Sequence, residues 1–303
     1  LNCVANARLL AEGPFRRVWI QPAAGDAGGA LGAALLVWHQ LLERPRLPQP
    51  SDAQQGSLLG PAYGNAAVRA ALDAAGAVYQ AAGSEEELLE RTARLLSQGK
   101  VVGFFQGRME FGPRALGCRS ILGDPRDAGM QSRMNQKIKF RESFRPFAPV
   151  VLREHAAEYF DLPPQVESPY MLLTAQVSAA HRRPVDDGGR RGLELLALSR
   201  SDIPAVTHVD GSARLQTVDE ERHGRLARLL RRFHALTGCP VLINTSFNVR
   251  GEPIVCSPED ALRCFFATDM DALAIEDFLL LRSEQPERLL ARREEHLARF
   301  APD

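Results

Sequence analysis

Residues 103–152, GFFQGRMEFGPRALGCRSILGDPRDAGMQSRMNQKIKFRESFRPFAPVVL, hold the strongest signal in the sequence. From Phe105 to Arg153 the chain has ten Arg or Lys residues against four Asp or Glu residues, a net charge of +6, whereas the whole chain is neutral. We call residues 105–153 the basic island. A basic island threaded with Gly and Pro favours a pocket for a phosphate-bearing ligand, because a nucleic-acid surface usually makes a whole domain basic. A solvated basic loop is the alternative interpretation.

Lysine is scarce in this chain, and its placement sharpens that signal. Only three of the 37 basic residues are lysines, and two of them, Lys137 and Lys139, fall in the basic island. A lysine offers a compact point charge where an arginine offers a planar fork. The island therefore combines two kinds of phosphate ligand.

Composition restricts the class of protein. With 303 residues, of which 45% are hydrophobic, the chain can bury a full core, and its length suggests about two domains. The five cysteines are odd in number and form no CxxC pair, which argues against structural zinc and a disulfide framework. No apolar run reaches the roughly 18 residues of a membrane helix. We therefore expect a cytoplasmic protein with neither a membrane nor a nucleic-acid partner.

The first residues predict a division of the chain. Leu1 stands where an initiator methionine is usual, and no signal-peptide pattern follows it. Residues 1–42 predict a helix, a strand over RRVWIQ (16–21), a Gly-rich loop and a second helix. Prolines and polar residues then predict a linker. We expect the end of an amino-terminal domain over 1–45, a linker over 46–62 and a second domain over 63–303, all from the carboxyl-terminal part of a longer protein.

The second domain alternates helix and strand signals. Ser84 and Glu87 form a capping box for a helix to about residue 98, a second helix is predicted over 219–237, and Ser257 caps a third. An Asp210-Gly211 turn predicts a hairpin. Strands are predicted within KVVGFFQ (100–106), RPFAPVVL (145–152), YMLLTAQVS (170–178), PVLINTSFN (240–248) and DALAIEDFLLLR (271–282). This pattern predicts an α/β fold with a mixed, twisted sheet and flanking helices.

Several side chains of the basic island are candidate phosphate ligands. Phosphates need fixed donors from several directions, which arginine forks and lysine ammonium groups supply. Gly112-Pro113 predicts a rigid turn that presents Arg114. Three further candidates come just before or at the start of the strand predicted within 145–152. Ordinary surface ion pairs are the alternative for any one of them. The candidates are Arg114, Arg119, Lys139, Arg141 and Arg145.

Two other constellations bear chemistry. Residues 244–248, NTSFN, follow an apolar strand, and the small polar side chains of Asn244, Ser246 and Asn248 are suited to orienting a nucleotide or an acyl phosphate. A plain turn is the alternative. Asp26, within GDAGG, is a candidate metal or hydroxyl ligand, although Asp and Gly are also ordinary turn residues. The seven histidines show no metal-ligand spacing.

Taken together, these strings resemble the O-carbamoyltransferases that modify antibiotics and nodulation factors. LNCVANARLLAEGPFRRVWIQPAAGDAGGALGAAL (1–35) resembles the end of their amino-terminal domain, which has an actin/Hsp70-like kinase fold. GRMEFGPRALGCRSILGDPRD (107–127), NQKIKFRESFRPFAPVV (135–151) and NTSFNVRGEPIVCSPEDA (244–261) resemble their carboxyl-terminal domain, which is similar to threonylcarbamoyl-AMP synthases. The K-x-R and S-x-N elements of those synthases match Lys139-Phe140-Arg141 and Ser246-Phe247-Asn248.

The resemblance implies a reaction in two steps. ATP, with Mg²⁺, and carbamoyl phosphate would give carbamoyl-AMP, and the carbamoyl group would then pass to a hydroxyl of a small-molecule acceptor. Lys139, Arg114 and Arg145 would be catalytic. The nucleotide and phosphates would be bound by Arg114, Arg119, Lys139, Arg141, Arg145, Asn244, Ser246 and Asn248.

The resemblance also implies an iron in the transfer site, for which Asp26 matches the acidic ligand. The histidine ligands of that iron lie in an amino-terminal half that this chain lacks, so a partner of the chain would be that half. A homodimer stays open. Two other functions compete: a carbamoyl-adenylate synthase acting in tRNA modification, against which the zero net charge argues, and a non-catalytic nucleotide-binding module.

Overall fold

The computed structural model describes residues 1–300 apart from nine positions, which are Arg16, Arg17, Gln49, Pro50, Ser51, Ala53, Pro164, Asp187 and Arg292. Three predicted features therefore lie partly outside the described residues: the strand over 16–21, the linker over 46–62 and the end of the second domain, residues 301–303.

Within the described residues, nine strands form one sheet in the order β1-β9-β8-β2-β3-β7-β4-β6-β5. The pairs β2–β8 and β4–β6 are parallel and the other pairs are antiparallel, so the predicted mixed sheet is confirmed. The strands are β1 (Gln80–Ala81), β2 (Val102–Phe105), β3 (Arg119–Gly123), β4 (Ala148–Leu152), β5 (Leu173–Gln176), β6 (Ser212–Val218), β7 (Val241–Ser246), β8 (Ala272–Ile275) and β9 (Phe278–Leu281).

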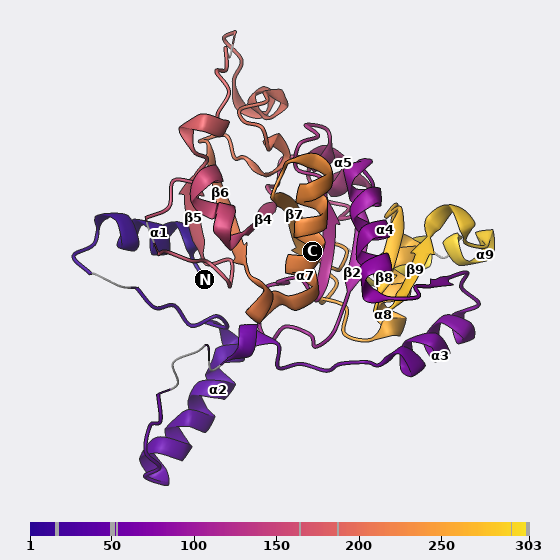
Figure 1. The fold of residues 1–303 in the computed structure, drawn as a ribbon, viewed down its shortest axis with the longest axis horizontal. Coiled ribbons are helices and arrows are strands. Elements are labelled where there is room, and N and C mark those ends of the chain that lie inside the picture. Colours follow the sequence, from indigo (N-terminus) through magenta and orange to yellow (C-terminus); the bar gives the residue numbers. More distant parts are fainter. Residues whose placement is uncertain are drawn as a thin grey trace.

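Helices flank this sheet (Figure 1). The α-helices are α1 (Cys3–Glu12), α2 (Asp26–Leu36), α3 (Asn65–Ala75), α4 (Glu85–Ser97), α5 (Met130–Lys137), α6 (Ala156–Tyr159), α7 (Glu220–Thr237), α8 (Pro258–Ala267), α9 (Glu287–Leu290) and α10 (Arg293–Leu297). A π-helical turn, Val37–Leu41, continues α2. Short 3-10 turns occupy Gln55–Ser57, Arg153–His155, Ala179–His181, Gly192–Ala197, Pro204–Val206, Arg282–Glu284 and Ala298–Phe300.

Local sequence explains where the longer helices begin. Ser84 accepts a hydrogen bond from the backbone N–H of Glu87 at 3.2 Å, which starts α4 as predicted. Ser257 and Asp260 form a reciprocal capping box at α8. The helical spacing of Leu226, Leu229, Leu230, Phe233 and Leu236 predicts a buried stripe on α7. The first four are fully or almost fully buried, but Leu236, near the end of the helix, is 45% exposed. Helices α4 and α7 pack against each other and against the sheet.

Two strand predictions are wrong. Val18–Gln21 form no strand, and Trp19 is 78% exposed. A strand needs backbone hydrogen bonds to a neighbouring strand, and this segment pairs with none of the described strands. At the Asp210-Gly211 turn only the following segment, β6, becomes a strand; residues 207–209 do not, and β6 pairs with β4 and β5 instead.

The amino-terminal segment lies outside the sheet. Helix α1 packs against β5, and the Asn6 side-chain amide donates to the Leu172 carbonyl at 3.0 Å. Helix α2 extends away from the rest of the molecule in Figure 1, and it buries no residue. Among the described helices, none is both long and apolar enough to cross a bilayer.

Candidate anion-binding and catalytic site

Lys139 is the centre of the candidate site. One residue, Ile138, separates it from the end of α5, and it is only 3% exposed. Its ammonium group donates to both the carbonyl and the hydroxyl of Ser246, at 2.8 and 3.3 Å, and to the carbonyl and the Oδ1 atom of Asn248, at 2.7 and 2.6 Å. The K-x-R and S-x-N segments thus meet in the fold. Burial, aided by the charge of Arg141, lowers the pKa of Lys139 to about 7.

The backbone between the two basic residues is constrained. Phe140 has a φ of 48°, in the left-handed region that a non-glycine residue seldom occupies. The fully buried Asn135 holds the segment in this shape, because its amide donates to the carbonyls of Ser143 and Arg145 at 3.1 and 2.8 Å. Its Oδ1 atom accepts from Arg141 Nε at 2.6 Å. Asn135 therefore positions both arginines of this segment.

Four arginines from three segments of the chain form a cluster of positive charge, which we call the arginine cluster: Arg114, Arg141, Arg145 and Arg214. Burial lowers the pKa of Arg141 to about 10, and the charges of Arg145 and Arg214 contribute. Burial, followed by the charge of Arg114, also lowers the pKa of Arg214. The charges therefore act on one another in sequence: Arg145 and Arg214 on Arg141, and Arg114 on Arg214.

The arginine cluster lacks the partners that usually neutralise arginine. Among the described residues, the side chains of Arg114 and Arg214 form no ion pair and no hydrogen bond, and the Nε atom of each is buried without an acceptor. Arg145 has only a 4.0 Å contact with the half-exposed Glu142. Buried donors without acceptors are costly. A multiply charged anion would satisfy both groups at once.

The loop that carries Arg114, residues 107–118, is organised around a buried carboxylate. Glu110 is 5% exposed, and its Oε1 atom accepts from the backbone N–H groups of Leu116 and Cys118, each at 2.7 Å. Asn244 supports the loop from β7, because its amide donates to the Ala115 carbonyl at 3.2 Å. Asn244 is 1% exposed, and its Oδ1 atom has no hydrogen-bond partner among the residues that the structure describes. The predicted polar strand end thus holds the basic loop in place.

Arg119 differs from the other predicted phosphate ligands in its surroundings. It is fully buried, and its guanidinium donates to four backbone carbonyls, those of Pro61, Gln106, Gly107 and Cys118. It also stacks on Phe105, with 3.5 Å between the guanidinium carbon and the ring centroid. These contacts anchor the ends of the loop, and binding of a phosphate by Arg119 stays a prediction.

Asp26 comes three residues after Ala23, which lies against Gly112 of the 107–118 loop. It is exposed in the first turn of α2. No group of three or more His, Cys, Asp or Glu residues within the described part of the chain could hold a metal ion. A single carboxylate does not make a tight iron site, so the residues described here do not fit the iron that the resemblance implies.

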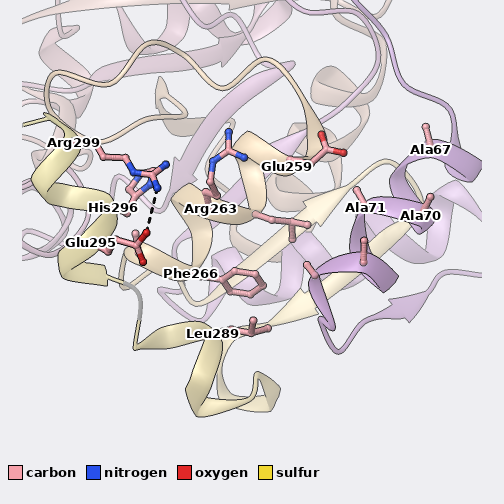
Figure 2. Close-up of a pocket in the computed structure, with 14 residues that line it drawn as sticks. Ala67, Ala70, Ala71, Glu259, Arg263, Phe266, Leu289, Glu295, His296 and Arg299 are labelled. Atoms are coloured by element: carbon pink, nitrogen blue, oxygen red, sulfur yellow. Dashed lines mark hydrogen bonds and ion pairs between the residues drawn. The ribbon is translucent and has the colours of Figure 1, made fainter.

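A pocket of about 670 Å³ lies elsewhere, between α3, α8 and the carboxyl-terminal helices (Figure 2). Apolar side chains such as Ala71, Leu262 and Phe266 line it together with charged side chains such as Arg263. None of the candidate phosphate ligands lines it. The chemistry of the basic island and this cavity are therefore separate features.

Three residues of the site carried no usable sequence signal. Arg214 stands alone in a strand, outside the basic island, and only the β5–β6 pairing shows where it lies. Asn135 lies within the island but is neither basic nor in a recognisable motif. Glu110 precedes the Gly-Pro turn, where an acidic residue would ordinarily be solvent-exposed. Asn135 and Glu110 act through hydrogen bonds within the island, whereas Arg214 acts through its charge.

Comparison with known proteins identifies the family. A model described as the carbamoyltransferase C-terminus matches residues 93–282, and one described as the carbamoyltransferase N-terminus matches residues 1–35. The chain belongs to the carbamoyltransferase family. This confirms the family resemblance of the basic island and the NTSFN segment.

Named relatives of this carbamoyltransferase chain include nodulation proteins. It is 40% identical to nodulation protein NolNO of Sinorhizobium fredii over 289 residues, which are 94% of this chain and 39% of that protein. It is 39% identical to nodulation protein NolO of Bradyrhizobium diazoefficiens, over 92% of this chain and 47% of that protein. A Synechocystis protein, sll1178, is 57% identical over 95% of this chain and 47% of its own length. The chain spans about half the length, or less, of these relatives.

Among solved structures, full-length HypF in its phosphate- and nucleotide-bound form matches with a TM-score of 0.41 and 17% identity. The match covers 68% of this chain and 22% of that one.

Proposed function

We propose that this carbamoyltransferase chain forms carbamoyl adenylate from ATP and carbamoyl phosphate. The observation that carries the proposal is the pairing of Lys139 with Ser246 and Asn248 beside an arginine cluster whose Arg114 and Arg214 have buried Nε atoms without acceptors. Two polyanions repel each other, so a site that joins them needs several fixed cations in a partly dry place. The K-x-R and S-x-N matches and the family membership support the same chemistry.

The atoms of this reaction balance if one water is consumed. Hydrolysis of carbamoyl phosphate breaks its carbonyl C–O–P link and gives carbamate and phosphate. A carbamate oxygen then attacks the α-phosphorus of ATP. The bond between this phosphorus and the oxygen that bridges it to the β-phosphate breaks, and pyrophosphate leaves. The product is carbamoyl-AMP, and positioning of the two anions supplies much of the rate.

The described side chains have distinct roles in this proposal. Arg114, Arg145 and Lys139 would contact the phosphate groups and the charge that develops at the α-phosphorus. Ser246 and Asn248 would orient the carbamoyl or adenylyl group while they hold the ammonium group. Mg²⁺ would bind to the nucleotide phosphates, which is its usual mode in sites with few protein carboxylates.

The second step, transfer of the carbamoyl group to a hydroxyl, would need an amino-terminal domain, and the relatives, of which this chain covers 39% and 47%, are long enough to hold one. Residues 1–45 would be the end of that domain, with an actin/Hsp70-like fold. The exposed apolar side chains of Leu36, Trp38 and Leu41 would then be covered by it, since an exposed row of large apolar side chains usually marks an interface. The acceptor would be a small molecule in the cytoplasm.

The proposal is tested by release of pyrophosphate from ATP. We expect release by the full chain only when carbamoyl phosphate is also present, and loss of release in the Lys139→Met variant. Binding of ATP without any pyrophosphate release, with or without a separately supplied amino-terminal domain, would favour a non-catalytic nucleotide-binding module. Release that does not depend on carbamoyl phosphate would contradict the proposed substrate.

A further inference from the structure

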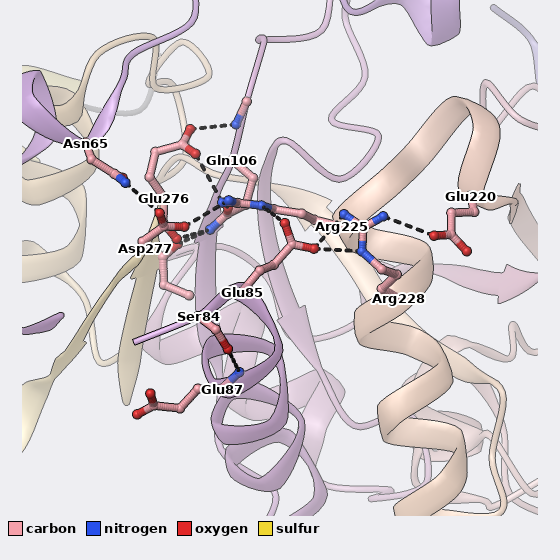
Figure 3. Close-up of polar contacts among 12 residues, drawn as sticks. Asn65, Ser84, Glu85, Glu87, Gln106, Glu220, Arg225, Arg228, Glu276 and Asp277 are labelled. Carbon is pink, nitrogen blue, oxygen red and sulfur yellow. Dashed lines mark hydrogen bonds and ion pairs between the residues drawn. The ribbon is translucent and has the colours of Figure 1, made fainter. Parts of the chain in front are cut away.

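The first residues of the Arg114 loop are bound by a second polar network, on the α7 side of the sheet (Figure 3). Arg225 of α7 is at its centre. Its guanidinium donates to Glu85 Oε2 at 2.8 Å, to Glu276 Oε2 at 3.1 Å and to Asp277 Oδ1 at 2.8 Å, and it also donates to the side-chain carbonyl of Gln106. One side chain therefore joins the start of α4, the end of β2 and the turn between β8 and β9.

Glu276 connects this network directly to the loop. Its Oε1 atom accepts from the backbone N–H of Gly107 at 2.6 Å, while its Oε2 atom accepts from Arg225. Gln106 is held on both sides, because its amide donates to the carbonyls of Ala274 and Glu276 at 3.3 Å. The backbone of residues 106 and 107 is thus fixed by two side chains and by Arg225.

Glu276 retains this contact in an unfavourable backbone conformation. It is the first residue of a two-residue turn between β8 and β9, and its φ is 44°. Glycine is the usual residue at such a position, because it adopts positive φ without a steric penalty. Glu276 is also 9% exposed, and burial raises the pKa of its carboxyl group. A strained, buried carboxylate that binds a loop backbone is the kind of outlier that suggests a functional constraint.

The two carboxylates act on opposite ends of the same loop. Glu276 holds the N–H of Gly107, and Glu110 holds the N–H groups of Leu116 and Cys118. Arg114 lies between these anchors, and among the described residues its side chain forms no hydrogen bond or ion pair that would fix it. The place from which its side chain extends is therefore set by the loop backbone.

We propose that Arg225 and Glu276 are positioning residues for the anion site: they fix the start of the 107–118 loop so that Arg114 reaches the bound phosphate groups. This inference rests on the proposed function, because it assigns the arginine cluster to a phosphate-bearing ligand. Neither residue touches the ligand. Their effect on binding is exerted through Arg114, and that dependence can be measured.

A double-mutant cycle with inorganic pyrophosphate as the probe tests the inference. Binding to the full chain is measured by calorimetry for the parent and for Glu276→Gln, Arg114→Gln and the variant with both changes. We expect Glu276→Gln to weaken pyrophosphate binding about tenfold when Arg114 is present. The NH2 group of the glutamine would face the N–H donors of Arg225 in place of an accepting oxygen. When Arg114 is already glutamine, we expect Glu276→Gln to change binding less than twofold. Equal weakening in both backgrounds would overturn the inference, and so would no weakening in the parent.

Arg228 provides the matched control. It lies one turn further along α7 and also pairs with Glu85, and with Glu220, but it makes no contact with Gln106 or Glu276 (Figure 3). Arg228→Gln should change pyrophosphate binding less than twofold. If Glu276→Gln does not fold, as judged by its thermal midpoint, Arg225→Lys replaces it in the cycle with the same expectations.

The outcome separates this inference from the proposed reaction. A parent chain that binds pyrophosphate and shows the coupling, but releases no pyrophosphate from ATP and carbamoyl phosphate, would overturn the reaction and leave the positioning role. A parent that binds no pyrophosphate would overturn the positioning role itself.

Discussion

The ammonium nitrogen of Lys139 lies 2.6 Å from the Oδ1 atom of Asn248, although 109 residues separate the two in the chain. The same nitrogen contacts Ser246, so the K-x-R and S-x-N segments form one structural unit. This unit and the unpaired arginines beside it are the basis of the following predictions.

Replacement of Lys139 should abolish most of the activity. Its ammonium group would interact more strongly with the transition state than with the bound substrates, and loss of such a group typically costs on the order of 3 kcal/mol, or about a hundredfold in rate. Because Lys139 is 3% exposed, Lys139→Met, which keeps most of the volume, is preferable to Lys139→Ala. Pyrophosphate release and the thermal midpoint are measured together. Unchanged release in a folded variant would mean that Lys139 has only a structural role.

Lys139 should also make stability depend on pH. Its pKa is about 7 in the folded chain, whereas an unfolded lysine titrates near 10.5, so between these values the unfolded chain binds more protons. The free energy of unfolding should therefore rise as the pH rises from about 7 to about 10, by at most about 1.4 kcal/mol per pH unit from this group. Denaturant titrations at several pH values would measure the slope. The slope should be shallower in Lys139→Met; identical slopes would contradict the lowered pKa.

Replacement of Arg214 should weaken ATP binding without lowering the stability of the fold. The Nε atom of its half-buried guanidinium has no acceptor, and the side chain has no acidic partner among the described residues. Arg214→Gln should weaken ATP binding by roughly tenfold, about 1.4 kcal/mol, which is near the value of one hydrogen bond to a charged group. Its thermal midpoint should stay the same or rise, because a neutral amide is easier to bury than a charge.

Arg232, an exposed arginine of α7 that lies 3.9 Å from Glu90, provides the control for that prediction. Arg232→Gln should change neither ATP binding nor the thermal midpoint measurably. If Arg214→Gln unfolded the chain while ATP binding by the folded fraction stayed normal, the assignment of Arg214 to the anion site would be refuted.

Gly117 should not tolerate a side chain. Its φ is 121°, and a Cβ atom there would lie 2.3 Å from Cδ2 of Leu226. Strain and overpacking together predict that Gly117→Ala lowers the free energy of unfolding by about 3 kcal/mol. Gly29→Ala, in α2, is the contrasting change: nothing lies within 4 Å of the new methyl, so it should raise stability by about 0.5–1 kcal/mol. If urea titrations gave the same free energy of unfolding for both variants, the close packing of Gly117 against Leu226 would be contradicted.

The sequence by itself determined the elements that depend on near neighbours. The Ser84 and Ser257 caps, the apolar spacing of α7 and the buried run in β2 each concern residues within a few positions of one another, and the structure confirms them. The basic island and the polar NTSFN segment were also visible, because composition needs no knowledge of the fold. The segment around Trp19 has a strand-like composition, and it failed as a prediction because a strand also needs a partner edge.

Only the tertiary structure decided which polar residues meet. Arg214 joins the arginine cluster because β6 pairs with β4 and β5, and Glu276 reaches Gly107 because β8 lies parallel to β2. Arg119 and Arg114 have the same chemistry in the sequence, yet one is bound to four carbonyls and the other has no partner among the described residues. Hydrogen bonds and charge interactions act over a few ångströms, and only sheet pairing brings residues more than a hundred positions apart within that range.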